Sequence, residues 1–438
     1  MPHPVSCAPA GADAGMVAGV VYEREGWRTY GIDGPFFEGI GGAEVKVGDA
    51  AAGTSEPCGA YGVAAPARTL VTLHGEGFAD SWFRHHADAH SRQDVGLYRE
   101  HAVTPRPGFM KGVHVDTNDP RATVEALLDT YAHAASLGAK LVVDKRAIDV
   151  LDFDDRHNVV KMSTAELRSP AEYKALADGA RARGVELVLY SRVEPHSFPS
   201  YFDVLNANLD NDPLWDAWFA AYTEAIVVAA TRARDAGIGT LVLGGGGGQR
   251  HAYTRWESVV RAIRDAGFSG QLMYVGSFAP YPSGDFIELA RANHNDPGPF
   301  LAQFDAVGMT IKNLYLGGAR RTRDALASNI RSLVLTAGAG LKPVVLFVET
   351  AATADATTSD DFVGLCETRP SDFYQQADVY QAVFEAVNQG ANIAGVFTNE
   401  YRVTDADCDG LPNLTGDTSP SIHSKPAEAV LSWWFKRL

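Results

Sequence analysis

The sequence predicts an α/β protein in which a small all-β sandwich precedes a TIM (β/α)8 barrel. Residues 16–98 carry short β-rich runs separated by Gly, Pro and Ser turns, and they show no helical period. From Gly108 onward, apolar runs alternate with stretches whose apolar residues recur every three or four positions, as in amphipathic helices. The length of 438 residues leaves room for both parts.

The second part contains eight apolar runs that are long enough to be strands. Continuous apolar strands indicate a parallel sheet that is covered on both faces. Eight strands alternating with helices match a closed barrel better than a doubly wound sheet, and no G-x-G-x-x-G follows the first run. The runs cover residues 109–115, 140–144, 185–193, 239–244, 270–278, 304–310, 342–349 and 393–400.

The β-rich segment contains short motifs in a recognisable order. They are Gly42-Ala43-Glu44-Val45, Thr54, Gly59, Tyr61, Leu70 and Gly77-Phe78. In this order they resemble the carboxypeptidase-regulatory-like (transthyretin-like) sandwich, which implies an accessory module without a catalytic role. We expect a leader at 1–15, this sandwich at 16–98, a linker at 99–107 and the barrel at 108–438.

Charge and hydropathy exclude two classes of function. The chain has 38 basic and 54 acidic residues, a net charge of −16, and such a surface repels nucleic acid. No apolar run reaches the length of about 18 residues that a membrane-spanning helix needs.

The first 15 residues lack the charged and apolar regions of a signal peptide. We interpret them as the leader of an exported protein whose signal was trimmed. The sequence does not indicate the oligomeric state.

Four cysteines occur, and no two of them form a C-x-x-C pair, which argues against a zinc knuckle or a thioredoxin-type site. Paired in sequence order, Cys7–Cys58 and Cys366–Cys408 would make two disulfides, each within one part of the chain. Four unrelated buried thiols are the alternative.

Polar side chains follow the predicted strands, whose carboxyl ends form the active-site face in a barrel of this kind. Glu349 and Glu400 end the seventh and eighth runs, and Glu194 directly follows the third. Paired carboxyl groups suit glycoside hydrolysis, in which one acts as an acid and the other as a nucleophile or base. We expect these three glutamates to be catalytic in a protein that acts on a polysaccharide or oligosaccharide. The expected substrate-binding residues are His114, Asp116, Asp144, His196, His251, Lys312, Tyr315 and Tyr401.

Asp144 has a second interpretation. It stands beside Lys145 and Arg146, so a structural ion pair is the alternative to a sugar contact.

Further motifs support the glycoside hydrolase interpretation. They are Trp218-Phe219-Ala220-Ala221-Tyr222, Trp256, Phe304-Asp305-Ala306-Val307-Gly308, Lys342-Pro343-Val344 with Glu349-Thr350, Gly395-Val396-Phe397, and Lys425-Pro426-Ala427-Glu428 with the closing WWF. In this order they resemble the retaining (β/α)8 glycoside hydrolases with catalytic glutamates on strands 4 and 7, and especially the mannanase-like family 113. The resemblance implies that Glu349 is the nucleophile.

The chain departs from that family after strand 4, where the family carries its acid/base in Gly-x-Glu. Here Leu243 is followed by five glycines at 244–248. General acid–base help is typically worth about 10²–10⁴-fold, so the loss matters. Glu194, Glu400 or His251 would have to supply the proton instead. Otherwise the glycines are a local loss of an acid, or the protein is a non-catalytic glycan-binding or scaffold protein.

A second acidic motif predicts a metal site. Residues 405–413 satisfy D-x-D-x-D-G-x-x-N, which places alternate carboxylates around one cation and a glycine at the sharp turn. The Glu of a regular EF-hand is replaced by Gly416, so we expect a truncated loop with a structural Ca²⁺; a solvated acidic loop is the alternative. The predicted ligands are Asp405, Asp407, Asp409, Asn413 and Asp417, and we expect no organic cofactor.

Overall fold

The structure is a computed structural model. It describes residues 15–24, 39–66, 68–85, 93–116, 122–197, 201, 208, 211–244, 253–278, 301–312, 323–336, 342, 344–353, 372–403, 407–408, 411–412 and 418–438.

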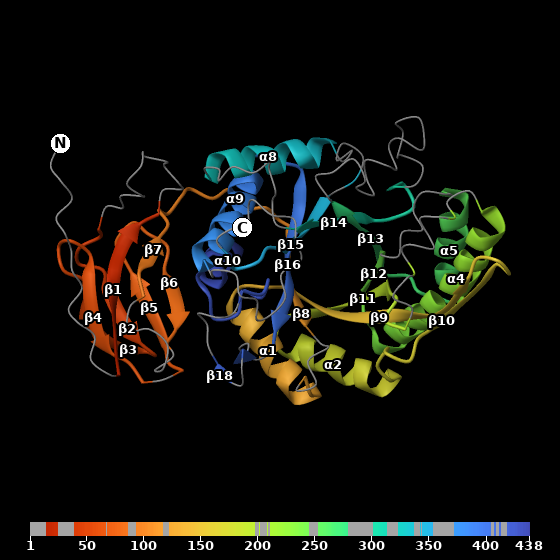
Figure 1. Cartoon of the computed structure of the whole chain (residues 1–438), viewed down its shortest axis with the longest axis horizontal. Helices are drawn as coiled ribbons and strands as arrows, with labels where there is room; N and C mark the ends of the chain where they lie inside the picture. Colours follow the sequence, from red (N-terminus) through yellow and green to blue (C-terminus); the bar gives the residue numbers. More distant parts are fainter. Residues whose placement is uncertain are drawn as a thin grey trace.

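Two small sheets form the N-terminal part of the molecule (Figure 1, red to orange). One has the strand order β4-β1-β7 and the other the order β3-β2-β5-β6. Alternate residues of these strands face inward, as expected for strands with one buried face, and valines such as Val17, Val45 and Val71 fill the shared core. The strands are β1 (Met16–Glu23), β2 (Glu44–Val47), β3 (Ala50–Thr54), β4 (Ala60–Ala64), β5 (Leu70–His74), β6 (Ser81–Arg84) and β7 (Val95–Leu97).

Within the described residues, eight parallel strands close into a barrel. The order is β8-β9-β11-β12-β13-β14-β15-β16, and β16 returns to pair with β8. The predicted α/β fold class, a TIM barrel after a small β part, is therefore confirmed. The barrel strands are β8 (Met110–Asp116), β9 (Leu141–Asp154), β11 (Glu186–Glu194), β12 (Thr240–Gly244), β13 (Gln271–Phe278), β14 (Ala306–Lys312), β15 (Val344–Glu349) and β16 (Ile393–Arg402).

The sheet of the barrel contains one strand that was not predicted. β10 (Val159–Ser163) pairs antiparallel with the far end of β9 and extends the sheet beyond the barrel wall. Two two-residue strands, β17 (Asp407–Cys408) and β18 (Leu411–Pro412), pair with each other.

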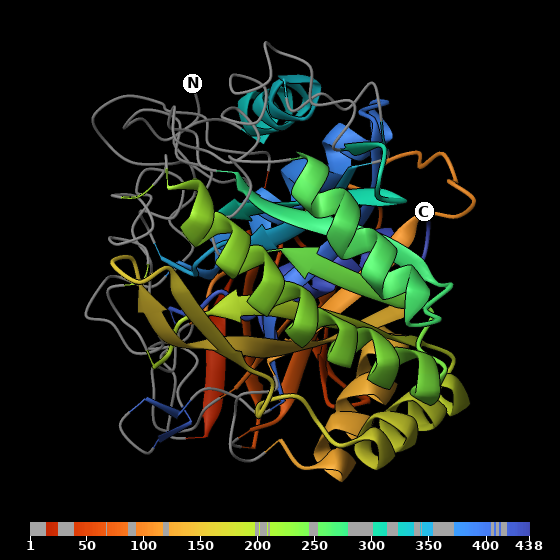
Figure 2. The same cartoon turned by 90° about the vertical axis from the view of Figure 1, so that its right-hand side faces the viewer.

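Helices cover the outside of the barrel, and Figure 2 shows α4 and α5 lying across the strands on one side. Local sequence fixes where they start and stop. Ser169 and Glu172 form a reciprocal capping box at the start of α2, and Gly237 ends α4 in the left-handed conformation. The helices are α1 (Val124–Ser136), α2 (Pro170–Ala182), α4 (Asp212–Ala236), α5 (Tyr253–Asp265), α8 (Arg323–Thr336), α9 (Phe373–Asn388) and α10 (Pro426–Phe435).

Strand alternation separates the barrel interior from its outer wall. Val143, Tyr190 and Phe347 belong to a small buried cluster inside the barrel, whereas their neighbours along the strands pack with the helices. Phe397 lies over Gly112, where an added Cβ would come within 2.0 Å of its ring. The interior is thus filled by side chains up to the level at which the polar strand ends begin.

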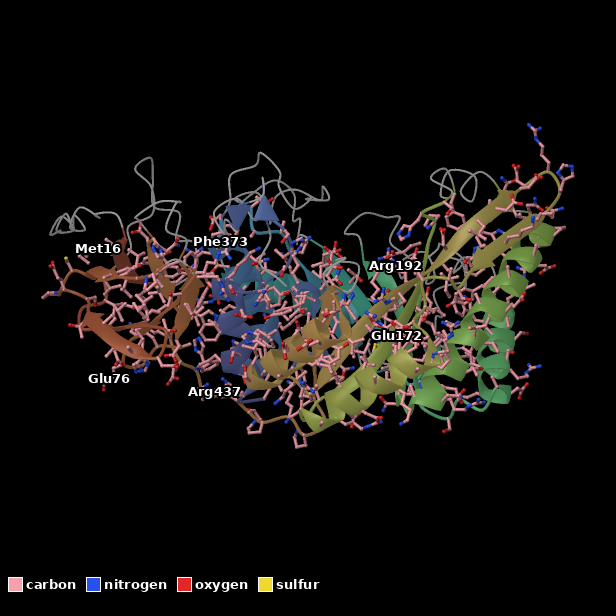
Figure 3. All side chains as sticks on the ribbon, turned by 90° about the horizontal axis from the view of Figure 1, so that it is seen from below. Met16, Glu76, Glu172, Arg192, Phe373 and Arg437 are labelled. Atoms are coloured by element: carbon pink, nitrogen blue, oxygen red, sulfur yellow. The ribbon has the colours of Figure 1, made fainter. Side chains whose placement is uncertain are left out.

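The β-sandwich packs against α9 and α10 of the barrel. Arg24, after β1, makes a two-point ion pair with Asp378 of α9 at 2.9 and 2.7 Å, and both side chains are buried. Tyr98 donates a third hydrogen bond to Asp378 at 2.8 Å. Figure 3 labels Phe373, at the start of α9, next to the sandwich. No helix in the described parts of the chain is long and apolar enough to cross a membrane.

Candidate functional site

Glu349 is the last residue of β15 and continues the inward-facing row of Val345 and Phe347. Only 6% of its surface is exposed. Asn399, near the end of the adjacent strand β16, donates a hydrogen bond from its side-chain amide to Oε2 of Glu349. The carboxylate is therefore held in one orientation at the carboxyl end of the barrel, where barrel enzymes carry their chemistry.

His114 on β8 continues this chain of hydrogen bonds. Its Nδ1 bonds to Oδ1 of Asn399. Because the Asn399 amide already donates to Glu349, its oxygen is an acceptor, and His114 must carry its proton on Nδ1. Burial, reinforced by the positive charge of Lys145, lowers the pKa of His114 to about 3. His114 is thus a neutral imidazole that fixes the Asn399 amide, which in turn fixes Glu349.

Glu400 follows Asn399 at a bulge in β16. The register between β16 and β8 shifts between Thr398 and Tyr401, and Glu400 has a φ of +55°. A non-glycine residue in this region is strained by about 1–3 kcal/mol and is common at functional sites. Burial and the negative charge of Glu349 raise the pKa of Glu400, so a proton is retained on it more readily than on an ordinary glutamate.

Glu194 ends β11 in a different electrostatic setting. Its Oε1 lies 2.7 Å from Lys145 Nζ and 3.9 Å from Arg192, and its Oε2 lies 3.2 Å from His196 Nε2. Burial alone would raise the pKa of Glu194, but the charges of Lys145, Arg192 and His196 lower it overall. Glu194 is therefore an ionised carboxylate among basic side chains and is unsuited to donating a proton.

Arg192 and Tyr190 belong to the same group of residues and were not predicted as site residues. Burial opposes the charge of Arg192, but Tyr190 and the three glutamates raise its pKa. Burial raises the pKa of Tyr190 to about 12, and its ring lies 6.2 Å from that of His114. The period of two along β11, which puts Tyr190, Arg192 and Glu194 on one face, is the sequence signal that could have found them.

The electrostatic neighbours of Glu400 include Asp116, another predicted site residue. His196 is half-exposed and contacts both Glu194 and, at 3.0 Å, Glu166. The structure thus brings together six of the predicted side chains: Glu349, Glu400, Glu194, His114, Asp116 and His196.

Asp144 and Tyr401 do not join this group. Asp144 is fully buried, with its oxygens 3.3 Å from Arg146 and 3.2 Å from Arg168. It alternates with the inward-facing Val143 and Lys145, so it lies on the helix side of the wall, and the prediction of a sugar contact gives way to the ion-pair alternative. Tyr401 is also fully buried and donates to Glu428 of α10, because the bulge at Glu400 reverses the alternation.

Several predicted residues cannot be placed. His251, Tyr315, Asp405, Asp409, Asn413 and Asp417 lie outside the described residues, and for Lys312 and Asp407 the backbone alone is described. Cys58 is disulfide-bonded, but Cys7 and Cys366 also lie outside the described residues, so the two predicted pairings stay predictions.

The end of the fourth barrel strand shows why glycine stands there. Gly244, the last residue of β12, has a φ of +146°, and an added Cβ would fall 2.1 Å from the carbonyl oxygen of Val275. No side chain fits at this position without moving the neighbouring strand. The remaining glycines, at 245–248, lie outside the described residues.

The aromatic motif residues of α4 and α5 are parts of the core. Trp218 stacks on Tyr222 with ring centroids 5.0 Å apart, and Trp256 meets Tyr222 edge to face at 5.6 Å. They pack the helices against the outer wall of the barrel and take no part in the site.

The sequence matches no family model and no curated protein. Its structure is similar to solved structures of a family 113 β-1,4-mannanase, one with a TM-score of 0.55 at 15% identity over 75% of this chain and 99% of that chain. It is also similar to the family 113 β-mannanase of Alicyclobacillus acidocaldarius, with a TM-score of 0.54 at 17% identity over 75% of this chain and 97% of that chain. At these identities the likeness shows a shared fold, the (β/α)8 barrel on which these hydrolases are built.

Proposed function

We propose that this protein is a glycoside hydrolase in which Glu349 is the nucleophile and Glu400 the proton donor. The observation that carries the proposal is the contrast between two neighbouring carboxyl groups. Glu349 accepts a hydrogen bond from Asn399 that holds its carboxyl group in place, while burial and the charge of Glu349 raise the pKa of Glu400. Glycosidic cleavage requires two carboxyl groups, one of which supplies a proton, and the raised pKa of Glu400 suits it to that role.

The reaction follows from these roles. Glu349 attacks the anomeric carbon while Glu400 transfers its proton to the departing glycosidic oxygen. Water then attacks the glycosyl–Glu349 ester, and Glu400 takes the proton from that water, which restores both groups. Glu194 stays ionised beside Lys145 and suits the recognition of sugar hydroxyls.

The proposed substrate is a polysaccharide or oligosaccharide. β-1,4-Mannan is the first to test, because the solved structures that share the fold include β-1,4-mannanases. The full chain would be assayed for released reducing ends on a panel of polysaccharides that includes mannan.

Three variants separate the roles of the glutamates. We expect Glu349→Gln and Glu400→Gln each to lose at least about 10²–10⁴-fold in kcat, since each removes a group that takes part in the transition state. Glu194→Gln should act mainly on KM, and the exposed Asp178→Asn serves as the surface control. Full activity in both Glu349→Gln and Glu400→Gln would refute the assignment.

The alternative is a non-catalytic glycan-binding or scaffold protein. The observation that favours it is Gly244, whose backbone leaves no room for a side chain at the end of β12, next to the place where the similar family carries its acid. Binding of a glycan without turnover on every polysaccharide of the panel would establish this alternative in place of the hydrolase.

Two further properties accompany the proposal. We propose that residues 405–417 hold a structural Ca²⁺ and that the protein is exported to the cell exterior. Calcium is tested by titrating EDTA and then Ca²⁺ during thermal unfolding, because a bound ion raises the melting temperature. An unchanged melting temperature in both steps would count against the site.

A further inference from the structure

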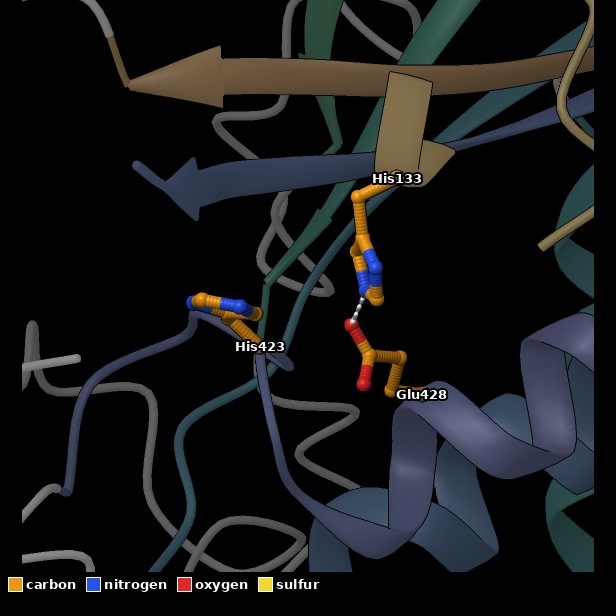
Figure 4. Close-up of side chains that lie close together, drawn as sticks. All are labelled: His133, His423 and Glu428. Atoms are coloured by element: carbon orange, nitrogen blue, oxygen red, sulfur yellow. Dashed lines mark hydrogen bonds and ion pairs between the residues drawn. The ribbon is translucent and has the colours of Figure 1, made fainter. Parts of the chain in front are cut away.

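Three metal-ligating side chains converge on the outside of the barrel, apart from the carboxylate site. His133 comes from the last turn of α1, His423 precedes α10, and Glu428 lies in its first turn (Figure 4). One ligand atom from each lies within 4.8 Å of the other two. His133 Nε2 is 3.0 Å from Oε1 of Glu428, and the two imidazole rings meet edge to face at 5.7 Å between centroids.

We propose that His133, His423 and Glu428 form a binding site for a divalent transition metal ion, with Zn²⁺ as the best match. Two imidazoles and one carboxylate are a zinc ligand set that leaves a fourth position for water. Two ligands at 2.0–2.1 Å from a tetrahedral zinc are separated by roughly 3.3 Å. The separation of 3.0 Å between His133 and Glu428 is close to that value, so a small opening of the pair admits the ion.

The surroundings of Glu428 support this proposal, because they already orient its carboxylate. Tyr401 donates to Oε1, while Trp82 Nε1 at 2.9 Å and the backbone N–H of Ser424 at 3.2 Å donate to Oε2. Such donors behind a ligating carboxylate fix its direction and charge, and metal sites depend on them. Oε1 is the oxygen that lies 3.0 Å from His133 Nε2, so it is the one that would bind the ion.

Exposure gives the ion a way in. The side chain of His133 is 44% exposed, whereas Glu428 is buried. Arg84 of β6 also belongs to this region, since it donates a hydrogen bond to Ser424 Oγ at 3.1 Å. Since Trp82 of the same strand bonds to Glu428, the ion would tie together α1, α10 and the edge strand of the sandwich.

The test is calorimetric titration of the full, chelator-treated chain with Zn²⁺ at pH 7.5, followed by thermal unfolding with and without Zn²⁺. We expect one Zn²⁺ ion to bind at this site and to raise the melting temperature of the protein. His133→Gln and His423→Gln should each weaken that binding at least tenfold and abolish the shift. Tyr401→Phe, which removes one orienting donor, should weaken binding about 10- to 100-fold.

His157→Gln is the matched control, because His157 is exposed and pairs with Asp154 as His133 pairs with Glu428. It should bind Zn²⁺ as the unaltered chain does. The Ca²⁺ response of residues 405–417 should also persist in the histidine variants, which separates the two metal proposals. Absence of Zn²⁺ binding in the unaltered chain, or unchanged affinity in either His133→Gln or His423→Gln, would overturn the proposal.

Discussion

Asn399 donates a hydrogen bond from its side-chain amide to Oε2 of Glu349, and its oxygen accepts one from His114. Three residues from three neighbouring strands thus form one chain that ends on the candidate nucleophile. Burial and Lys145 lower the pKa of His114 to about 3, so His114 stays neutral. The donor and acceptor directions of these hydrogen bonds therefore stay the same.

We predict that Asn399→Ala reduces kcat through loss of this orientation. A hydrogen bond to a charged group contributes about 1.5–3 kcal/mol, which corresponds to roughly a 10- to 150-fold loss in rate. KM should change little, since the side-chain amide of Asn399 is already bonded to Glu349 and His114. Steady-state kinetics on the substrate found in the panel check this. A variant with unchanged kcat would show that Glu349 is held by other contacts.

Because of the titration of Glu400, the free energy of unfolding should fall as the pH rises. Its pKa is raised in the folded protein by burial and by Glu349, so over this range the folded state binds more protons than the unfolded state. Stability is then lost between the unfolded value of about 4.3 and the raised pKa of the folded protein. Glu400→Gln removes this dependence, and we expect it to raise the melting temperature at pH 7 while activity is lost.

Thermal unfolding of both proteins from pH 4 to pH 8 measures the effect of Glu400. The two melting curves should coincide at the acid end and separate as the pH increases. A variant that is less stable than the unaltered chain at pH 7 would contradict the prediction. The Glu194→Gln variant, whose carboxylate has a lowered pKa, should show the opposite sign.

Loss of the Arg24–Asp378 pair should destabilise the contact between the sandwich and the barrel. Arg24→Met leaves Asp378 buried without its main partner, and removing one member of a buried pair costs about 3–5 kcal/mol. The control is Lys174→Met, which removes an exposed pair with Asp178 and should leave stability unchanged within error. Urea unfolding measures both, and equal stability of the two variants would refute the prediction.

Gly112→Ala should destabilise the barrel interior, because its methyl group would overlap the ring of Phe397. Overpacking of this kind typically costs about 1–3 kcal/mol. Phe397→Leu in the same chain should restore part of the loss, while Gly239→Ala, which meets no atom within 4 Å, should have little effect. Additive costs of Gly112→Ala and Phe397→Leu would show that the two residues do not compete for space.

Much of the architecture was predictable because it depends on local periodicity. The apolar run that ends in Glu349 is a barrel strand, and the helix patterns between the runs are the outer helices. The hairpin of β9 and β10 was missed, because the predicted run stopped at Asp144 and the alternation beyond it is less regular. In the site, the expectation that functional residues lie at the carboxyl ends of the strands identified Glu349, Glu194 and Glu400. It could not distinguish the electrostatic setting of each.

The sequence by itself determined the barrel and the position of Glu349, because an apolar run followed by a carboxylate depends on neighbours along the chain. The tertiary structure decided which strand-end residues face inward. Asp144 faces the helices because it is out of phase with Val143 and Lys145, and Tyr401 faces them because the bulge at Glu400 adds a residue. Both outcomes depend on the register between strands far apart in the sequence, and so does the contact of Asn399 with Glu349.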